Sequence, residues 1–274
     1  MSGKWFRGIT PSRRPAPGIN TDVAHPARVY DYWLGGKDNF AADRQAAEAV
    51  IAVRPGIIRD IRENRNFLIR AVRYLAAEAG IGQFLDLGTG IPTSPNVHEA
   101  VQAAVPESRV VYVDNDPIVL AHARALLTST PEGATAYVQA DAQDTGTILA
   151  EAAKILDFSQ PVAVMFLMIL QYIPDGDQPQ QIVATLMDAV PPGSYLAQSD
   201  TAGDIDTDRV ATATSRLNSR MGPAQLHRRT REQMAAYYTG LDMVEPGLVP
   251  LPEWRALASP AHLIPCYAGI GRKP

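Results

Sequence analysis

A short glycine-rich run holds the first residues whose types and spacing suit chemistry. Asp86, Gly88, Thr89 and Gly90 follow the apolar segment 83–87 and precede a predicted helix. Glycines at such a turn let the backbone approach a ligand closely, where a Cβ atom would clash. Open α/β folds bind their ligands at the carboxyl ends of the strands. The run is therefore a candidate ligand site; the alternative is a tight strand-to-helix turn that binds nothing.

Two further acids follow the next two predicted strands. Asp114 ends the second strand, 24 residues after Gly90, where a carboxylate can accept hydrogen bonds from both ribose hydroxyls. Asp141 ends the third strand, where it can accept one from an adenine amino group. Each acid alone is better interpreted as a helix cap or a loop residue, and we interpret Asp116, which precedes a proline, as an N-cap. Three acids at the ends of three successive strands together indicate one nucleoside-like ligand.

The identity of that ligand depends on the glycines and on the first acid. The dinucleotide fingerprint G-x-G-x-x-G needs a third glycine, but Thr93 stands at that position. Asp86 would place negative charge at the floor of the pocket and repel a pyrophosphate. The same charge suits a ligand with an ammonium and a sulfonium group, and S-adenosylmethionine has both. The pattern favours this cofactor, and an NAD-dependent oxidoreductase is the weaker alternative.

The elements that must position these acids alternate between strand and helix. Ser94 is the expected N-cap of the first core helix, with a proline at its first position. The alternation predicts a mostly parallel twisted sheet with helices on both faces and an antiparallel last strand. Strands are expected at 83–87, 109–113, 135–139, 162–170, 194–198, 248–254 and 266–270, and helices at 95–104, from 117 through Leu127, and at 148–156, 179–189 and 231–238.

Composition divides the chain into three parts. Residues 1–20 are rich in Pro, Gly and Arg and are expected to be a flexible tail. Residues 21–80 show helical spacing of apolar residues and are expected to form a helical cap. Residues 81–274 are expected to form a Rossmann-like core that binds the cofactor.

Charge, hydropathy and cysteine content argue against several classes of protein and of binding site. The net charge of −4 gives no general case for nucleic-acid binding, and the cluster 227–231 is interpreted as a solvated helix start. The longest apolar run, 162–170, is too short to span a bilayer. The single cysteine, Cys266, excludes a cysteine-based zinc site, and no histidine pattern predicts a metal. Without a signal peptide the chain is expected in the cytoplasm, and its oligomeric state stays open.

Four stretches, FLDLGTGIP, VVYVDNDP, VQAD and FLMILQYIPD, resemble the motif series of class I S-adenosylmethionine-dependent methyltransferases. From His25 to Lys273 the chain resembles more closely one actinobacterial family of this class, whose members have no known substrate. The long runs HPARVYDYWLGGKDNFAADR, RENRNFLIRAVRYLAAEAGIGQFLDLGTGIPT and VVYVDNDPIVLAHARALL carry this resemblance. It implies a Rossmann-like methyltransferase with a helical cap; a non-catalytic protein that binds the same cofactor is the alternative.

The resemblance also implies roles for individual residues. The glycine run would face the methionine part of the cofactor, and Asp114 would face the ribose. Asn115, Asp141 and Ala142 would lie beside the adenine, and Phe166 and Leu167 near the methionine part. Two departures from the class matter. Pro92 stands where many members have a third glycine, which puts the start of the following helix in doubt. Gln171 and Tyr172 replace two histidines found in many small-molecule methyltransferases, so no histidine base is available there.

The acceptor side is less defined. Tyr30, Tyr32 and Trp33 precede a double glycine and, with Gln171 and Tyr172, are candidates for the substrate pocket; the alternative is that the aromatics pack the helices onto the core.

Arg65 is a candidate for the cofactor carboxylate, since guanidinium geometry matches it. Asp200 and His98 are weak candidates for a catalytic role, and no general base is predicted. We expect a small-molecule acceptor.

Overall fold

The computed structural model describes residues 20–126, 128–256 and 262–274. Apart from Asn20, the predicted flexible tail lies outside these ranges, and so does Leu127. Within them, no helix has the length and apolar character needed to cross a bilayer.

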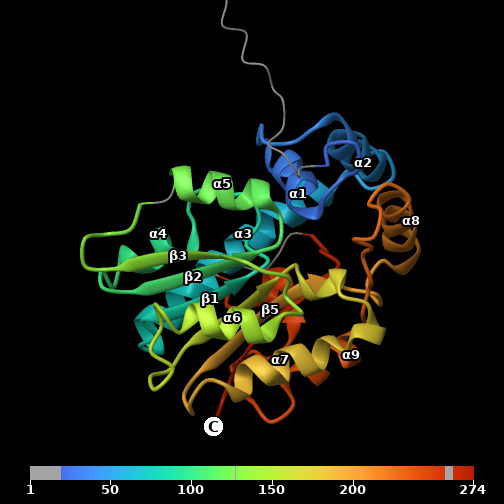
Figure 1. Ribbon diagram of the computed structural model, residues 1–274. Coiled ribbons are helices and arrows are strands. Elements are labelled where there is room, and N and C mark those ends of the chain that lie inside the picture. Colours follow the sequence, from blue (N-terminus) through green and yellow to red (C-terminus); the bar gives the residue numbers. More distant parts are fainter. Residues whose placement is uncertain (1–19, 127, 257–261) are drawn as a thin grey trace, which may run out of the picture.

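An eight-stranded sheet forms the centre of the molecule (Figure 1). Its strand order is β3-β2-β1-β4-β5-β8-β6, and β7 also pairs with β8. Strands β1 to β5 are parallel, while β8 runs antiparallel to β5, as predicted for the last strand. The order reverses between β1 and β4, which opens a crevice at their carboxyl ends. The strands are β1 Gln83–Leu87, β2 Arg109–Asp114, β3 Ala134–Gln139, β4 Ala163–Leu167, β5 Tyr195–Thr201, β6 Asp242–Met243, β7 Val249–Pro250 and β8 Cys266–Arg272.

Helices cover both faces of this sheet because its strands bury apolar residues on both sides. Successive side chains of a strand point to opposite faces. Phe84 therefore packs with α3 and α4, whereas Leu85 packs in the cluster that contains residues of α6 and α7. The helices are α1 Pro26–Leu34, α2 Ala41–Ile51, α3 Ile57–Arg73, α4 Val97–Gln102, α5 Pro117–Leu126, α6 Thr145–Ala152, α7 Pro179–Asp188, α8 Thr207–Asn218 and α9 Arg231–Ala235.

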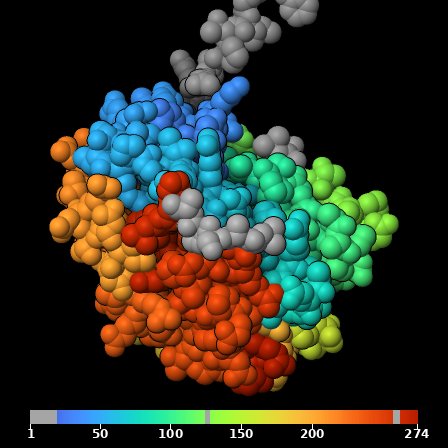
Figure 2. Space-filling model, turned by 180° about the vertical axis from the view of Figure 1, so that it is seen from behind, coloured from blue at the N-terminus to red at the C-terminus, as the bar shows by residue number. Residues whose placement is uncertain are grey.

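A separate hydrophobic cluster lies above the carboxyl ends of the strands. It joins α1, α2 and the start of α3 to α8, so a segment that follows β5 completes the N-terminal cap. Figure 2 shows the N-terminal helices in blue at the top of the molecule, beside the orange α8. Helix α8 is not predicted from the sequence, because its threonines and its serine weaken helix propensity. Its buried Val210, Ala213 and Leu217 nevertheless have helical spacing.

The predicted start of the first core helix is wrong. Asn96, not Ser94, precedes α4, and its amide donates a 2.6 Å hydrogen bond to Glu99 Oε2. The preceding carbonyls of Thr93 and Pro95 accept hydrogen bonds from Arg65, so this stretch is held outside the helix.

The ends of β4 and β7 also differ from the prediction. Strand β4 ends at Leu167 because Met168 has a left-handed φ of 60°, and residues 170–172 form a 3₁₀ turn. In the expected strand 248–254, Val249 and Pro250 form the antiparallel pair with β8, while the following residues turn into a 3₁₀ helix. The prolines of this segment cannot donate to a sheet ladder, which explains its short pairing.

Candidate active site

A cavity of about 430 Å³ lies where the sheet order reverses. One part of its wall consists of the strand ends, with the glycine turn and the acids at the carboxyl ends of β1, β2 and β3. The other part consists of α1, α3, α8 and the loop after β4. The cavity thus joins the predicted cofactor residues to the inside of the cap.

The glycine turn has the backbone conformation that favours glycine. Gly88 and Gly90 have φ angles of +64° and +67°, in the left-handed region. A Cβ atom on Gly88 would lie 2.4 Å from Ile169 Cγ1, so the missing side chain lets the loop after β4 pack on the turn. At Gly90 the nearest atom would be Ala27 Cβ at 3.9 Å, which leaves the cavity side of the turn open to a ligand.

Asp114 is buried at the end of β2 and lines the cavity. Its Oδ2 accepts a 2.8 Å hydrogen bond from the Gly90 amide, and its Oδ1 accepts one of 2.9 Å from the Asp116 amide. Burial raises the pKa of Asp114, while these two hydrogen bonds act in the opposite direction. The carboxylate is therefore held rigidly, and each oxygen keeps a second lone pair for a ligand hydroxyl.

Asp86 is buried beneath the glycine turn. Burial raises its pKa to about 7, while the Arg65 guanidinium and the Thr89 hydroxyl act in the opposite direction. Arg65 itself lines the cavity, and its Nη2 donates to the carbonyls of Thr93 at 2.7 Å and Pro95 at 2.5 Å. A buried acid and a backbone-anchored guanidinium therefore face the same space, which suits a ligand with both an ammonium and a carboxylate.

The third acid, Asp141, is hydrogen-bonded to Asn115, the residue that follows Asp114. Asn115 Nδ2 donates a 3.0 Å hydrogen bond to Asp141 Oδ2, and the Gln143 amide donates to Asp141 Oδ1 at 3.0 Å. Asn115, Asp141 and Ala142 all line the cavity, so the ends of β2 and β3 form one continuous edge of it.

Strand β4 contributes one of its two predicted residues. Leu167 lines the cavity, whereas Phe166 is fully buried in the core on the opposite face of the sheet. The alternation of strand side chains explains why only one of two neighbours reaches the site. Gln171 and Tyr172 also line the cavity. The Gln171 side chain is bound to backbone, since its Oε1 accepts a 3.0 Å hydrogen bond from the Thr201 amide.

The structure places neither weak catalytic candidate at the cavity. His98 is buried in α4, where its Nδ1 lies 2.8 Å from the Tyr112 hydroxyl, and burial lowers its pKa. Asp200 lies inside β5 because this strand is longer than predicted, and its Oδ2 accepts a 2.9 Å hydrogen bond from Gln198. Thr201 lines the cavity in its place.

Two of the three predicted aromatic residues reach the cavity. Tyr30 and Trp33 line it, whereas the Tyr32 hydroxyl donates to Glu48 on the outside of the cap. The Tyr30 hydroxyl accepts a 3.0 Å hydrogen bond from Asn64, whose Oδ1 accepts one of 2.7 Å from Ser199. This chain of hydrogen bonds connects α1 and α3 to β5, and it fixes the Tyr30 ring in the wall.

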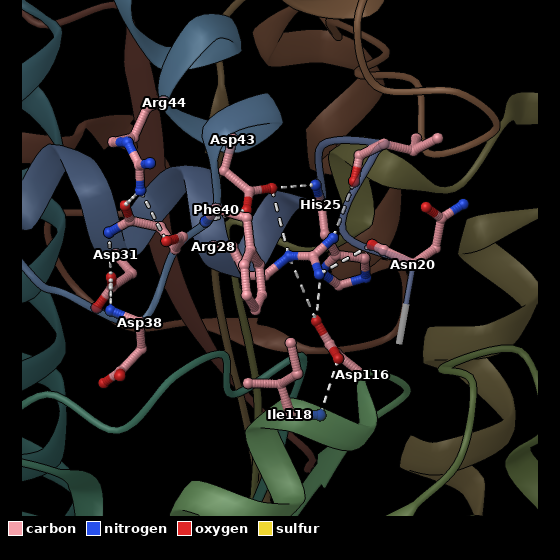
Figure 3. Close-up of polar contacts among 12 residues, drawn as sticks. Asn20, His25, Arg28, Asp31, Asp38, Phe40, Asp43, Arg44, Asp116 and Ile118 are labelled. Carbon is pink, nitrogen blue, oxygen red and sulfur yellow. Dashed lines mark hydrogen bonds and ion pairs between the residues drawn. The ribbon is translucent and has the colours of Figure 1, made fainter. Parts of the chain in front are cut away.

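A buried polar network attaches the N-terminal segment to the core (Figure 3). His25 Nδ1 lies 3.2 Å and Arg28 Nε 4.0 Å from Asp116 Oδ2, and Arg28 Nε lies 3.3 Å from Asp43 Oδ1. Asp116 Oδ1 meanwhile accepts a hydrogen bond from the Ile118 amide, which confirms its predicted role as a helix cap. Its second role could not be predicted from the sequence, because no local pattern relates Asp116 to His25 and Arg28, which are 91 and 88 positions earlier.

The basic cluster 227–231 is not simply a solvated helix start. Arg229 is buried, and its guanidinium donates to the carbonyls of Leu170 at 2.8 Å and Ile173 at 2.6 Å and to Asp175. Arg229 therefore holds the loop that carries Gln171 to the cavity wall. In the described ranges, no group of three or more His, Cys, Asp or Glu side chains is arranged to hold a metal ion.

The strand order and the acid-lined crevice define a Rossmann-like fold of the class I methyltransferase type. The sequence model of a family described as S-adenosyl methyltransferases matches residues 12–274. The chain belongs to this family, and its cofactor is S-adenosylmethionine. No curated protein matches the sequence.

Two solved structures are similar over nearly the whole chain. A protein of the DUF574 family from Streptomyces avermitilis has 43% sequence identity and a TM-score of 0.89, covering 93% of this chain and 99% of its own. A candidate methyltransferase from Thermobifida fusca has 40% identity and a TM-score of 0.86, covering 96% of this chain and 99% of its own. These matches confirm the predicted actinobacterial family.

Proposed function

We propose that this methyltransferase transfers a methyl group to a small molecule enclosed beneath the helical cap. The observation that carries the proposal is one cavity that joins the acids at the strand ends to the apolar inside of the cap. Cap residues Trp33, Val50 and Leu217 line the same cavity as Asp86 and Asp114. A pocket enclosed in this way suits a compact acceptor better than a protein or nucleic-acid surface.

The residues of the strand ends fit the cofactor. Asp86 would bind its ammonium group, which would offset the cost of keeping this carboxylate charged while buried. Arg65 would bind its carboxylate, Asp114 its ribose hydroxyls and Asp141 its adenine amino group. The open space in front of Gly90 lets the backbone approach the ligand closely. The side chain of Phe166 has no part in this set.

The bound cofactor supplies an electrophilic methyl carbon on a sulfonium. The contribution of the protein is to hold the acceptor in line with this carbon and to exclude water, and orientation alone is worth roughly 7–11 kcal/mol. Tyr30, Trp33 and Tyr172 provide the rigid walls for this orientation. His98 and Asp200 do not line the cavity, so neither is assigned as a general base, and we propose catalysis by orientation of the acceptor and exclusion of water.

Two measurements test the proposal. Calorimetry with S-adenosylhomocysteine tests cofactor binding. Incubation with methyl-labelled S-adenosylmethionine and a size-fractionated bacterial extract then shows which fraction accepts the label. We expect the label in the low-molecular-mass fraction. Transfer to protein or nucleic acid would contradict the small-molecule proposal, and binding without transfer to any fraction would favour a non-catalytic cofactor-binding protein.

A further inference from the structure

The part of the cavity beneath the cap has mostly apolar walls. Trp33 of α1, Val50 of α2, Ile61 of α3, and Val210 and Leu217 of α8 all line it. Of these, Trp33, Val50, Ile61 and Leu217 also belong to the hydrophobic cluster that holds the cap together. A molecule bound here would therefore bury apolar surface against a preformed wall, which favours binding.

One ion pair interrupts this apolar wall. Arg54, in the turn between α2 and α3, donates from Nη2 to Oδ2 of Asp60, in the first turn of α3. Arg54 is 7% exposed and Asp60 1% exposed, and both line the cavity. A buried ion pair is seldom worth more to stability than apolar residues of the same volume. Its position in the wall of the cavity therefore indicates a role in binding.

Both partners of this pair have unused hydrogen-bonding capacity. The guanidinium bonds through Nη2, and in the described part of the chain no acceptor contacts its Nε or Nη1. Asp60 Oδ1 is buried and has no hydrogen-bond donor there. Arg59 Nη2 lies 3.7 Å from this oxygen, too far for a hydrogen bond. Within the described residues, the wall thus holds guanidinium donors that no acceptor contacts beside a buried carboxylate oxygen without a donor, and leaving such an oxygen unsatisfied is costly.

We infer that the methyl acceptor is an uncharged, mostly apolar molecule whose polar end accepts a hydrogen bond from Arg54 and donates one to Asp60. A hydroxyl group or a primary amide has this chemistry. A carboxylate would face Asp60 as a like charge, and an ammonium would face Arg54 in the same way. The inference rests on the proposed function, since it specifies the substrate class of the same cavity.

The experiment uses three naphthalene probes that differ at one position: 2-naphthol, 2-naphthoate and 2-methylnaphthalene. S-Adenosylhomocysteine binding is measured first, by calorimetry, and the probes are then titrated into the protein saturated with it. The variant is the double substitution Arg54→Met and Asp60→Leu. It removes both charges at similar volume, so no uncompensated buried charge remains and the fold is expected to persist. Retained S-adenosylhomocysteine affinity in the variant verifies its folding.

We expect the wild type to bind 2-naphthol about 10–100-fold more tightly than either other probe, the range for hydrogen bonds to charged groups. In the double variant 2-naphthol should lose this advantage over 2-methylnaphthalene. Preference for 2-naphthoate, failure of 2-naphthol to bind the loaded wild type, or an unchanged preference in the double variant would each overturn the inference. Failure of S-adenosylhomocysteine itself to bind would instead count against the proposed function.

Discussion

The Gly90 amide donates a 2.8 Å hydrogen bond to Asp114 Oδ2, so the acid at the end of β2 fixes the glycine turn at the end of β1. The second oxygen of Asp114 holds the Asp116 amide at 2.9 Å. One carboxylate therefore sets the shape of two neighbouring strand ends and also faces the cavity. Its loss affects both the ligand contact and the arrangement of the backbone around it.

Substitution of this acid is expected to weaken cofactor binding strongly. In Asp114→Ala the Gly90 amide loses its acceptor and the ligand loses a charged partner, so S-adenosylhomocysteine binding should weaken by about 1–3 kcal/mol. Calorimetry measures the change. Asp188→Asn, at the exposed end of α7, is the matched control and should bind like the wild type. Equal affinities for Asp114→Ala and the control would show that this carboxylate does not contact the ligand.

Cofactor binding is also expected to depend on pH through Asp86, whose pKa burial raises to about 7. The ligand ammonium favours the ionised carboxylate, so below this pKa the free protein must release a proton on binding. The affinity should level off above about pH 8 and fall below it, by about tenfold between pH 8 and pH 6. Calorimetry in buffers of different ionisation enthalpy measures the released proton.

The control for this pH dependence is Asp86→Asn, which cannot titrate at this position. It should bind S-adenosylhomocysteine more weakly, with much less change between pH 6 and pH 8. A wild-type affinity that is flat over this range would rule out Asp86 as the group that receives the ammonium.

The sequence predicted the part of the site that depends on local order along the chain. Asp86, Asp114 and Asp141 each lie at or just after the carboxyl end of a strand, and parallel strands bring these ends to one edge. Which of the two neighbours Phe166 and Leu167 faces the cavity could not be predicted from their positions in the sequence. Strand β4 is apolar throughout because both faces are covered, so its pattern does not distinguish Phe166 from Leu167.

The features that the sequence analysis missed arise from contacts between distant segments. The pairing of Arg54 with Asp60 depends on the turn that joins two cap helices. The contact of His25 with Asp116 depends on how the cap sits on α5. The burial of Asp200 depends on the pairing of β5 with β8, which continues for three residues beyond the predicted strand end. Tertiary packing determines each of these.

Substitution of the first glycine is expected to disrupt the turn. In Gly88→Ala the new Cβ atom would lie 2.4 Å from Ile169 Cγ1, and the φ of +64° disfavours any residue with a side chain. We expect a loss of at least about 1–3 kcal/mol in the free energy of unfolding, the range for overpacking. Urea denaturation measures it. Gly82→Ala, where a Cβ atom would meet no neighbour within 4 Å, is the control and should change little.

The buried network at the N-terminus predicts that Arg28 stabilises the cap. Arg28→Met would leave the carboxylates of Asp43 and Asp116 buried without this guanidinium, which should cost about 3–5 kcal/mol of stability. Hydrogen exchange should increase in α1 and α2 before it increases in the sheet. The exposed Arg62→Met is the control, expected within about 0.5 kcal/mol of the wild type. Unchanged exchange in Arg28→Met would show that other contacts hold the cap.

The last prediction concerns Asp200, whose pKa burial raises from 3.8 to about 7 in the folded protein. Between these two values the folded state binds more protons than the unfolded state, so this residue makes stability fall as pH rises from about 4 to 7, with no further change above. Asp200→Asn removes the titration and keeps an acceptor for the Gln171 amide. The fall in unfolding free energy between pH 5 and pH 8 should therefore be smaller in this variant than in the wild type. The control Asp188→Asn should retain the wild-type dependence of stability on pH. If Asp200→Asn also shows the wild-type dependence, Asp200 stays ionised in the folded protein throughout this range.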